Sequence, residues 1–268
     1  MKCKIIAEAA TNHLGQLSKA KDLVIAARDC GADYIKFQAW QCRNIKHPTK
    51  RDIERELSDS DLLTLRNFAD KAGIKFLVSI FDIDRIGFIK NELGCDEIKI
   101  PSQDLTAWEL LKACYRNFGF VYLSTGMSTV DEIQKAKSCF PDNNLCLLHC
   151  VSKYPHTFQE AELAKIEYLP STNRGYSDHT ETNEAAKIAF MYDIDAYECH
   201  FTIRRDKSDK FSLAAKTARD VSEIVWWRDK LDTLEKPDFR LTINDRNMRW
   251  KWKNYRGQNH GSDIMRSS

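Results

Sequence analysis

The 268-residue sequence lacks several features that would place it in other classes of protein. No apolar run reaches the roughly 18 residues that a bilayer-spanning helix needs. Its 41 basic and 39 acidic residues leave a formal charge of only +2, so no overall field attracts nucleic acid or anionic lipid. These absences predict a soluble protein without a nucleic-acid or membrane partner, in which any anion-binding site is local.

The cysteines give no sign of a disulfide framework or a zinc site. There are nine, an odd number, without a CxxC pair. The first residues also lack the basic, apolar and small-residue order of a secretory signal peptide. Both observations predict reduced thiols in a cytoplasmic protein. Cys146 and Cys150 lie on one side of a predicted strand, but two cysteines alone lack the further ligands that zinc needs.

Short β-rich runs alternate with longer helical patterns, which is typical of βα units around a parallel sheet. The predicted strands are CKIIAEA from Cys3, YIKFQ from Tyr34, KFLVSI from Lys75, EIKI from Glu97, FVYLS from Phe120, LCLLHC from Leu145, RGYS from Arg174 and AYECHF from Ala196. The predicted helices begin near Ser18, Ser60, Asp82, Thr106, Ser128, Phe158 and Thr182, with an eighth from about Ala215 to Leu234. Eight units at this length predict an α/β fold, the (β/α)₈ TIM barrel.

We expect the barrel to occupy residues 1–234, with a C-terminal extension or linker remnant over 235–268. The tail contains RWKWKNYRG from Arg249, a basic and aromatic cluster of the kind that binds single-stranded nucleic acid. One short cluster without a binding fold is weak evidence. The favoured interpretation is an amphipathic segment that packs Trp250 and Trp252 against the barrel.

Two lysines interrupt strands that should be almost wholly apolar. Lys36 lies inside YIKFQ and Lys99 inside EIKI. A buried ammonium group needs an anionic partner. An ion pair with Glu8 or Glu97 explains either lysine alone, whereas two such lysines on different strands favour a shared anionic ligand.

Polar residues follow the carboxyl ends of the predicted strands, where barrel enzymes build their active sites. Lysines with hydroxyl and backbone donors at helix starts suit a phosphate, and Gly126 allows close approach of the backbone. His179 and His200 end adjacent strands and can share a cation such as Mn, Fe, Co or Zn. His149 is better explained as a core residue. The wider set is Glu8, His13, Lys36, Gln38, Lys99, Ser102, Ser124, Thr125, Ser152, Ser177, Asp178 and Thr202.

Seven segments resemble the catalytic barrel of the sialic acid synthases, which also make legionaminic and pseudaminic acid-type sugars. They are IIAEAATNHLGQLSKA, GADYIKFQ, IKIPSQDL, LSTGMSTVDEI, LLHCVSKYP, GYSDHT and ECHFT, in the family's order and spacing from Ile5 to about Ser212. The resemblance implies a transferase that joins phosphoenolpyruvate (PEP) to an open-chain, N-acetylmannosamine-like amino sugar. The expected products are a nonulosonic acid and phosphate.

The resemblance also implies roles for individual residues. His179 and His200 would bind a divalent metal, usually Mn²⁺, with Mg²⁺, Co²⁺ or Zn²⁺ as alternatives. Glu8 would act as an acid or base, Asp209 would contact the sugar and Tyr154 would lie beside it. PEP would be held by Lys36, Lys99, Ser102, Ser124, Ser152 and Ser177. The implied catalytic set is Glu8, Lys36, Lys99, His179 and His200.

The sequence departs from the family's pattern in three places. Val78, Ser79 and Ile80 stand where the family usually has STP, so one hydroxyl contact is expected to become apolar. The family's GPD turn appears as KSD, with Asp209 kept. The C-terminal antifreeze-like (SAF) domain, which gives an arginine to the sugar in the partner subunit, is not recognisable. A homodimer or a separately encoded lid domain is therefore the expected protein partner.

Other functions stay open on the sequence alone. The first is another PEP–aldose condensation, giving an eight- or seven-carbon acid. The second is a Schiff-base aldolase that uses Lys99 or Lys36 as its nucleophile, which requires a lysine with a low pKa. The third is a non-catalytic remnant that binds a sugar or a phosphate.

Overall fold

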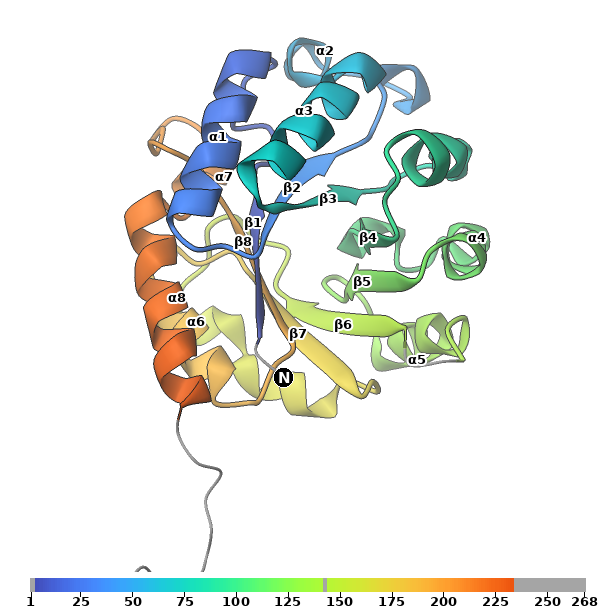
Figure 1. Ribbon diagram of the computed structural model, residues 1–268. Helices are drawn as coiled ribbons and strands as arrows, with labels where there is room; N and C mark the ends of the chain where they lie inside the picture. The colour runs from blue at the N-terminus through green and yellow to red at the C-terminus, as the bar shows by residue number, and fades with distance from the viewer. Residues whose placement is uncertain (1–2, 142–143, 234–268) are drawn as a thin grey trace, which may run out of the picture. The chain divides into compact units, whose positions relative to one another are not determined.

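The computed structural model describes residues 3–141 and 144–233. Eight parallel strands close into a barrel in sequence order, with helices outside the ring (Figure 1). The strands are β1 (Lys4–Glu8), β2 (Tyr34–Gln38), β3 (Lys75–Ser79), β4 (Glu97–Ile100), β5 (Phe120–Ser124), β6 (Leu145–Cys150), β7 (Asn173–Asp178) and β8 (Ala196–His200). This arrangement confirms the predicted (β/α)₈ barrel.

Most outer helices begin close to their predicted starts. They are α1 (Leu17–Asp29), α3 (Asp59–Ala72), α4 (Trp108–Asn117), α5 (Val130–Ser138), α6 (Glu184–Phe190) and α8 (Ala218–Asp232). Hydroxyl caps fix two of these starts, because Ser58 and Thr129 each form a capping box at α3 and α5. Two short helices, α2 (Lys50–Arg55) and α7 (Lys210–Leu213), were not predicted.

The helical stretches predicted near Asp82 and Phe158 are present, but neither is a regular α-helix. The first region holds a 3₁₀ turn, Ile83–Arg85, and a π-helical turn, Phe88–Glu92. There the buried Arg85 donates to the Ala39 carbonyl and pairs with Asp59, contacts that a sequence pattern does not reveal. The second region holds the 3₁₀ segments Gln159–Ala161 and Leu163–Tyr168, separated by Glu162 at a left-handed φ of 46°, which interrupts a right-handed helix.

Side chains that point into the barrel form layers, because alternate residues of a strand face the same side. An apolar cluster inside the barrel consists of Ile6, Tyr34, Leu77, Tyr122, Cys146, Leu148 and Ala196. At the amino ends of the strands, the hydroxyls of Tyr34 and Tyr122 donate to Glu97 at 2.9 and 3.0 Å. Glu97 therefore bonds to tyrosines at the amino ends of the strands and does not pair with Lys99. The inward-facing side chains at the carboxyl ends are mostly polar.

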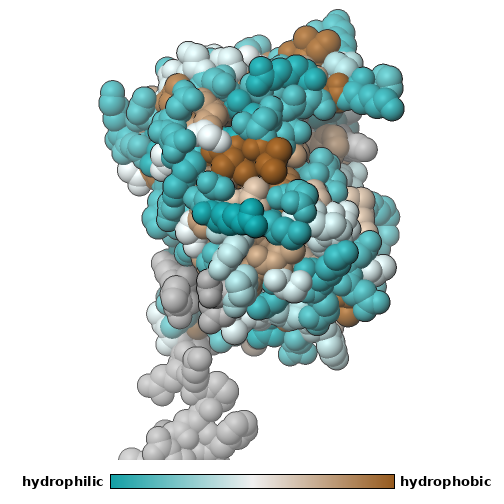
Figure 2. Space-filling view, turned by 90° about the vertical axis from the view of Figure 1, so that its right-hand side faces the viewer, coloured by the Kyte–Doolittle hydropathy of each residue, from teal (hydrophilic) through white to brown (hydrophobic). Residues whose placement is uncertain are grey.

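The face of the molecule in Figure 2 is mostly hydrophilic, and its hydrophobic side chains gather in small separate groups. None of the helices in the described segments is long and apolar enough to cross a bilayer. Several features of the sequence lie outside the described residues. They are the predicted helix end at Leu234, the 235–268 extension, and the RWKWKNYRG cluster with Trp250 and Trp252.

Candidate active site

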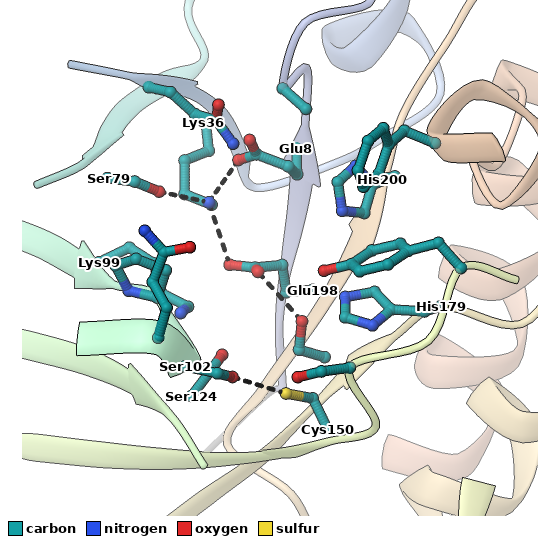
Figure 3. Close-up of a pocket in the computed structure, with 18 of the residues that line it drawn as sticks. Glu8, Lys36, Ser79, Lys99, Ser102, Ser124, Cys150, His179, Glu198 and His200 are labelled. Atoms are coloured by element: carbon teal, nitrogen blue, oxygen red, sulfur yellow. Dashed lines mark hydrogen bonds and ion pairs between the residues drawn. The ribbon is translucent and has the colours of Figure 1, made fainter. Parts of the chain in front are cut away.

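The carboxyl ends of the strands open into a cavity of about 520 Å³. Figure 3 shows His179 and His200 on one side of this cavity, Lys99 and Ser79 on the other, and Glu8 between them. The cavity wall brings together most of the residues that the sequence singled out: Glu8, Lys36, Gln38, Lys99, Ser102, Ser124, Ser152, Tyr154, Ser177, His179 and His200.

Lys36 is held by two carboxylates and one hydroxyl. Its ammonium forms an ion pair with Glu8, lies 3.5 Å from Oε2 of Glu198 and donates to Oγ of Ser79 at 2.7 Å. Burial alone would lower the pKa of Lys36, but the two carboxylates raise it above its ordinary value. The ion-pair interpretation with Glu8 therefore holds for Lys36, and Ser79 supplies a hydroxyl contact to it, whereas Val78 is buried and apolar.

Glu198 is a site residue that the sequence analysis missed. It accepts from the Ser177 hydroxyl at 3.1 Å and faces the cavity two residues before His200. A carboxylate inside the apolar run AYECHF is the same signal that drew attention to the two lysines. Burial raises the pKa of Glu8, whereas in Glu198 the charges of Lys36 and Lys99 outweigh burial and lower it. Two buried carboxylates thus differ in their hold on a proton.

Lys99 is as buried as Lys36 but has no such partners. Its Nζ donates to the carbonyl oxygen of Ile100 at 2.7 Å, and no carboxylate of the described chain lies within 4.0 Å of it. Burial is the main reason that the pKa of Lys99 falls below its ordinary value. An anionic ligand in the cavity would therefore stabilise this ammonium group more than the protein does.

A tight cradle of small polar groups lies beside Lys99. Oγ of Ser102 accepts from the Gly126 N–H at 3.1 Å and lies 3.0 Å from Sγ of Cys150. A Cβ on Gly126 would stand only 2.4 Å from Oγ of Ser152 and 2.7 Å from Sγ of Cys150. The close approach explains why this turn carries glycine, and it leaves hydroxyl and backbone groups around a space suited to an oxyanion.

His179 and His200 approach each other at the opposite wall, with their ring centroids 5.4 Å apart. Nδ1 of His179 lies 2.6 Å from the Val151 carbonyl, so it carries the proton and Nε2 keeps its lone pair. Nδ1 of His200 is buried without a hydrogen-bond partner in the described structure. Burial lowers the pKa of both imidazoles, to about 4 and about 3, so both are neutral near pH 7.

Two neutral imidazoles with available nitrogens fit a divalent cation that completes its coordination with oxygen ligands. The described residues contain no cluster of three or more His, Cys, Asp or Glu side chains that could form a complete protein cage. Cys146 belongs to the apolar cluster inside the barrel and Cys150 to the cradle, so they do not form the pair considered for zinc. His149 is a core residue, with Nε2 2.8 Å from the Ala161 carbonyl.

At the mouth of the cavity, Asp209, which was expected to contact the sugar, pairs with two arginines. Its Oδ2 lies 2.8 Å from Arg51 and 3.1 Å from Arg55, both on α2. Arg51 and Phe211 line the cavity, and the Arg51 guanidinium lies 5.1 Å from the Phe211 ring centroid. Tyr154 packs against Phe211 and against His179, with centroid distances of 4.9 and 4.0 Å. A cation and two aromatic rings thus form this rim.

Comparisons with known proteins identify the family and agree with the fold. The model of the NeuB family matches residues 23–226. The N,N'-diacetyllegionaminic acid synthase of Campylobacter jejuni is 34% identical over 233 residues, which cover 77% of this chain and 70% of that protein. An uncharacterized protein of Methanocaldococcus jannaschii is 34% identical over 231 residues, with 82% and 68% covered. The crystal structure of N-acetylneuraminic acid synthetase from Leptospira borgpetersenii, in complex with citrate, superimposes with a TM-score of 0.86 at 27% identity, covering 96% of this chain and 93% of that one.

Proposed function

The chain belongs to the NeuB family, and from this membership we propose that it is a transferase that joins PEP to an open-chain N-acylated amino sugar. The products would be a nonulosonic acid and inorganic phosphate. The observation that carries the proposal is the buried ammonium of Lys99, which lines the same cavity as Ser102, Cys150 and Ser152 of the cradle and has no carboxylate partner in the described chain. A phosphate or carboxylate of PEP would supply the missing negative charge.

His179 and His200 would hold a divalent cation, with Mn²⁺ preferred over Mg²⁺, Co²⁺ or Zn²⁺. When bound there, the cation supplies Lewis-acid polarisation of the acceptor's aldehyde oxygen. The protein's own part is to keep both imidazoles neutral and to fix the His179 tautomer through the Val151 carbonyl. Tyr154, in contact with both rings, would separate this cation from bulk water.

The protein's carboxylates would manage the protons of the reaction. A bond forms between C3 of PEP and the aldehyde carbon, and the aldehyde oxygen takes a proton from Glu8. Glu8 lies opposite His200 in the register of β1 and β8, and so close to the cation site. Water adds to the cationic C2 and passes a proton to Glu198. The C2–O bond then breaks, the leaving phosphate takes the C2 hydroxyl proton so that C2 becomes a ketone, and the proton on Glu198 returns to Glu8. Lys36, which contacts both carboxylates, would stabilise them as the protons move.

The test is to incubate the full chain, loaded with Mn²⁺, with PEP and a panel of N-acetylated hexoses. We expect phosphate release that requires both the cation and one sugar, and a product whose mass equals the sugar plus the three-carbon unit of PEP. A chelator should abolish release and added Mn²⁺ should restore it. Absence of release with every sugar, with and without an added SAF-type lid domain, would refute the proposal.

The Schiff-base aldolase is the second candidate, because the lowered pKa of Lys99 is also what an amine nucleophile needs. The two functions differ in covalent chemistry. Treatment with borohydride in the presence of substrate would reduce the Schiff base on Lys99 and add the mass of the substrate less one oxygen atom to the protein. The PEP-dependent reaction leaves the lysine unmodified and is sensitive to chelation.

A further inference from the structure

Lys216 is a fully buried lysine outside the cavity wall, in the segment between α7 and α8. An ammonium group in such a place costs several kcal/mol unless ion pairs and hydrogen bonds compensate for the lost water. Its Nζ lies 3.4 Å from Oδ2 of Asp178, which is also fully buried. Neither residue lines the cavity, so the role of the pair has to be read from its contacts with neighbouring segments.

The side chain of Lys216 fixes the loop that follows His179. Its Nζ donates to the carbonyl oxygen of Thr180 at 2.5 Å and to that of Thr182 at 2.6 Å. Asp178, the other member of the buried pair, accepts from the backbone N–H of Thr180 at 2.8 Å. The residues on both sides of His179 are therefore bound to one ammonium group.

The main chain of Lys216 fixes the end of β8. Its N–H donates to the carbonyl oxygen of His200 at 2.7 Å, and its carbonyl accepts from the Thr202 N–H at 3.0 Å. Asp178 strengthens the same junction, because its Oδ2 accepts from the Tyr197 hydroxyl of β8 at 2.7 Å. One residue thus binds the backbone of one histidine and the loop of the other.

We propose that Lys216 is a positioning residue that sets the separation of the His179 and His200 imidazoles for a shared divalent cation. The inference rests on the proposed function, in which those imidazoles bind the cation. Each histidine sits at the end of a strand, where the strand ladder no longer restrains the backbone fully. A single rigid residue tied to both ends reduces the reorganisation that cation binding would otherwise require.

The test compares Mn²⁺ binding by two variants that each lose a buried cation. Lys216→Met keeps the length of the side chain and removes the ammonium group. The matched control is Arg228→Met, because Arg228 is also buried but bonds to Asp33 and to the Cys3 carbonyl at the amino ends of the strands. Isothermal titration calorimetry gives the dissociation constant for Mn²⁺, and urea unfolding gives the stability of each variant.

We expect Lys216→Met to weaken Mn²⁺ binding by about 10- to 100-fold, the range found for lost support of metal ligands. Arg228→Met should lose stability but bind Mn²⁺ like the wild type. Should Lys216→Met fail to fold, Thr180→Val provides the second variant, since it removes the hydroxyl that contacts Lys216, Asp178 and the Thr182 carbonyl and keeps the lysine. We expect it to weaken Mn²⁺ binding by a smaller factor, about 3- to 10-fold.

Three outcomes would overturn the inference. Unchanged Mn²⁺ binding by a folded Lys216→Met, or by Thr180→Val where that variant replaces it, would show that the network does not position the imidazoles. Equal weakening in Arg228→Met would show a general effect of lost stability. Absence of Mn²⁺ binding in the wild type would instead remove the metal part of the proposed function, and the inference with it.

Discussion

Lys36 and Lys99 extend into one cavity from β2 and β4. Of these two lysines, only Lys36 has a carboxylate oxygen of the described chain within 4.0 Å of its ammonium nitrogen. Both side chains are almost fully buried. Their surroundings nevertheless give them opposite pKa shifts, because Glu8 and Glu198 compensate for burial at Lys36 and nothing comparable does so at Lys99. The two lysines should therefore differ in what they contribute to folding and to ligand binding.

Replacing each lysine by methionine should separate these contributions. Lys36→Met leaves two buried carboxylates without their cation, so we expect the free energy of unfolding to fall by about 3–5 kcal/mol. Lys99→Met removes an ammonium group that lacks a carboxylate partner, so its stability should be unchanged or higher, while the KM for PEP rises at least about tenfold. Urea unfolding and phosphate-release kinetics measure both effects. Equal destabilisation by the two substitutions would contradict this account of Lys99.

Because of the cradle, we expect alanine to be harmful at Gly126, both to stability and to PEP binding, but tolerated at an open glycine. Gly126→Ala would place a Cβ within 3.0 Å of three side-chain atoms, so we expect a stability loss of about 1–3 kcal/mol and a KM for PEP raised at least about tenfold. The control is Gly87→Ala, where the backbone is helical and no atom lies within 4 Å of the new Cβ. That substitution should be neutral or slightly stabilising. Calorimetric titration with PEP would measure the difference, and equal affinities in the two variants would argue against the cradle.

The sequence contained enough to predict the barrel, because the β and helical patterns alternate and the strands repeat at even spacing. It also predicted polar residues at the strand ends, since a lysine within a buried strand such as YIKFQ is conspicuous. Contacts between residues far apart in the chain could not be predicted from the sequence. The turn at Arg85 depends on a distant carboxylate, Asp59, and the partners of Asp209 lie on α2, about 155 residues earlier in the chain.

Glu198 shows where the reasoning from sequence stopped short. The run AYECHF carries a carboxylate at the inward-facing position two residues before His200, and the alternation rule that selected Lys36 and Lys99 selects it as well. Which lysine it would contact could not be predicted, because the register between non-adjacent strands follows from closure of the barrel. The same limit applies to the opposite pKa shifts of the two lysines, which depend on distances to Glu198 and Glu8.

Asp104 predicts a pH dependence of stability. Burial, with the charge of Asp82, raises its pKa to about 6, and its Oδ2 has no hydrogen-bond partner in the described structure. A raised pKa means that the folded state binds the proton more tightly than the unfolded state, whose aspartate pKa is about 4. This contribution to stability is complete below about pH 4 and is lost as the pH rises through about 6.

Asp104→Asn removes this titration. We expect the variant to gain stability relative to the wild type between pH 4 and pH 7, by about 1 kcal/mol once the partial exposure of the carboxyl group is allowed for. Urea unfolding at both pH values gives the difference between the two proteins, in which the titrations of all other groups cancel. A difference that is the same at pH 4 and pH 7 would show that Asp104 titrates normally.

The rim of the cavity predicts which side chain recognises the acceptor sugar. Arg51 lines the cavity, whereas Asp209 is occupied by Arg51 and Arg55. We expect Arg51→Gln to raise the KM for the acceptor about tenfold, equivalent to about 1.4 kcal/mol, and to leave the KM for PEP unchanged. The control is Lys50→Gln on the same helix, because Lys50 is 88% exposed and pairs with Glu54.

Asp209→Asn distinguishes direct contact with the sugar from support of Arg51. In the structure, Asp209 holds the guanidinium that faces the cavity, so the asparagine variant should raise the acceptor KM less than Arg51→Gln does. Asparagine still accepts a hydrogen bond from Arg51, although it loses the charge. The double variant should then add little to Arg51→Gln, because Asp209 would act through the residue already removed. Additive effects of the two substitutions would show instead that each side chain contacts the acceptor independently.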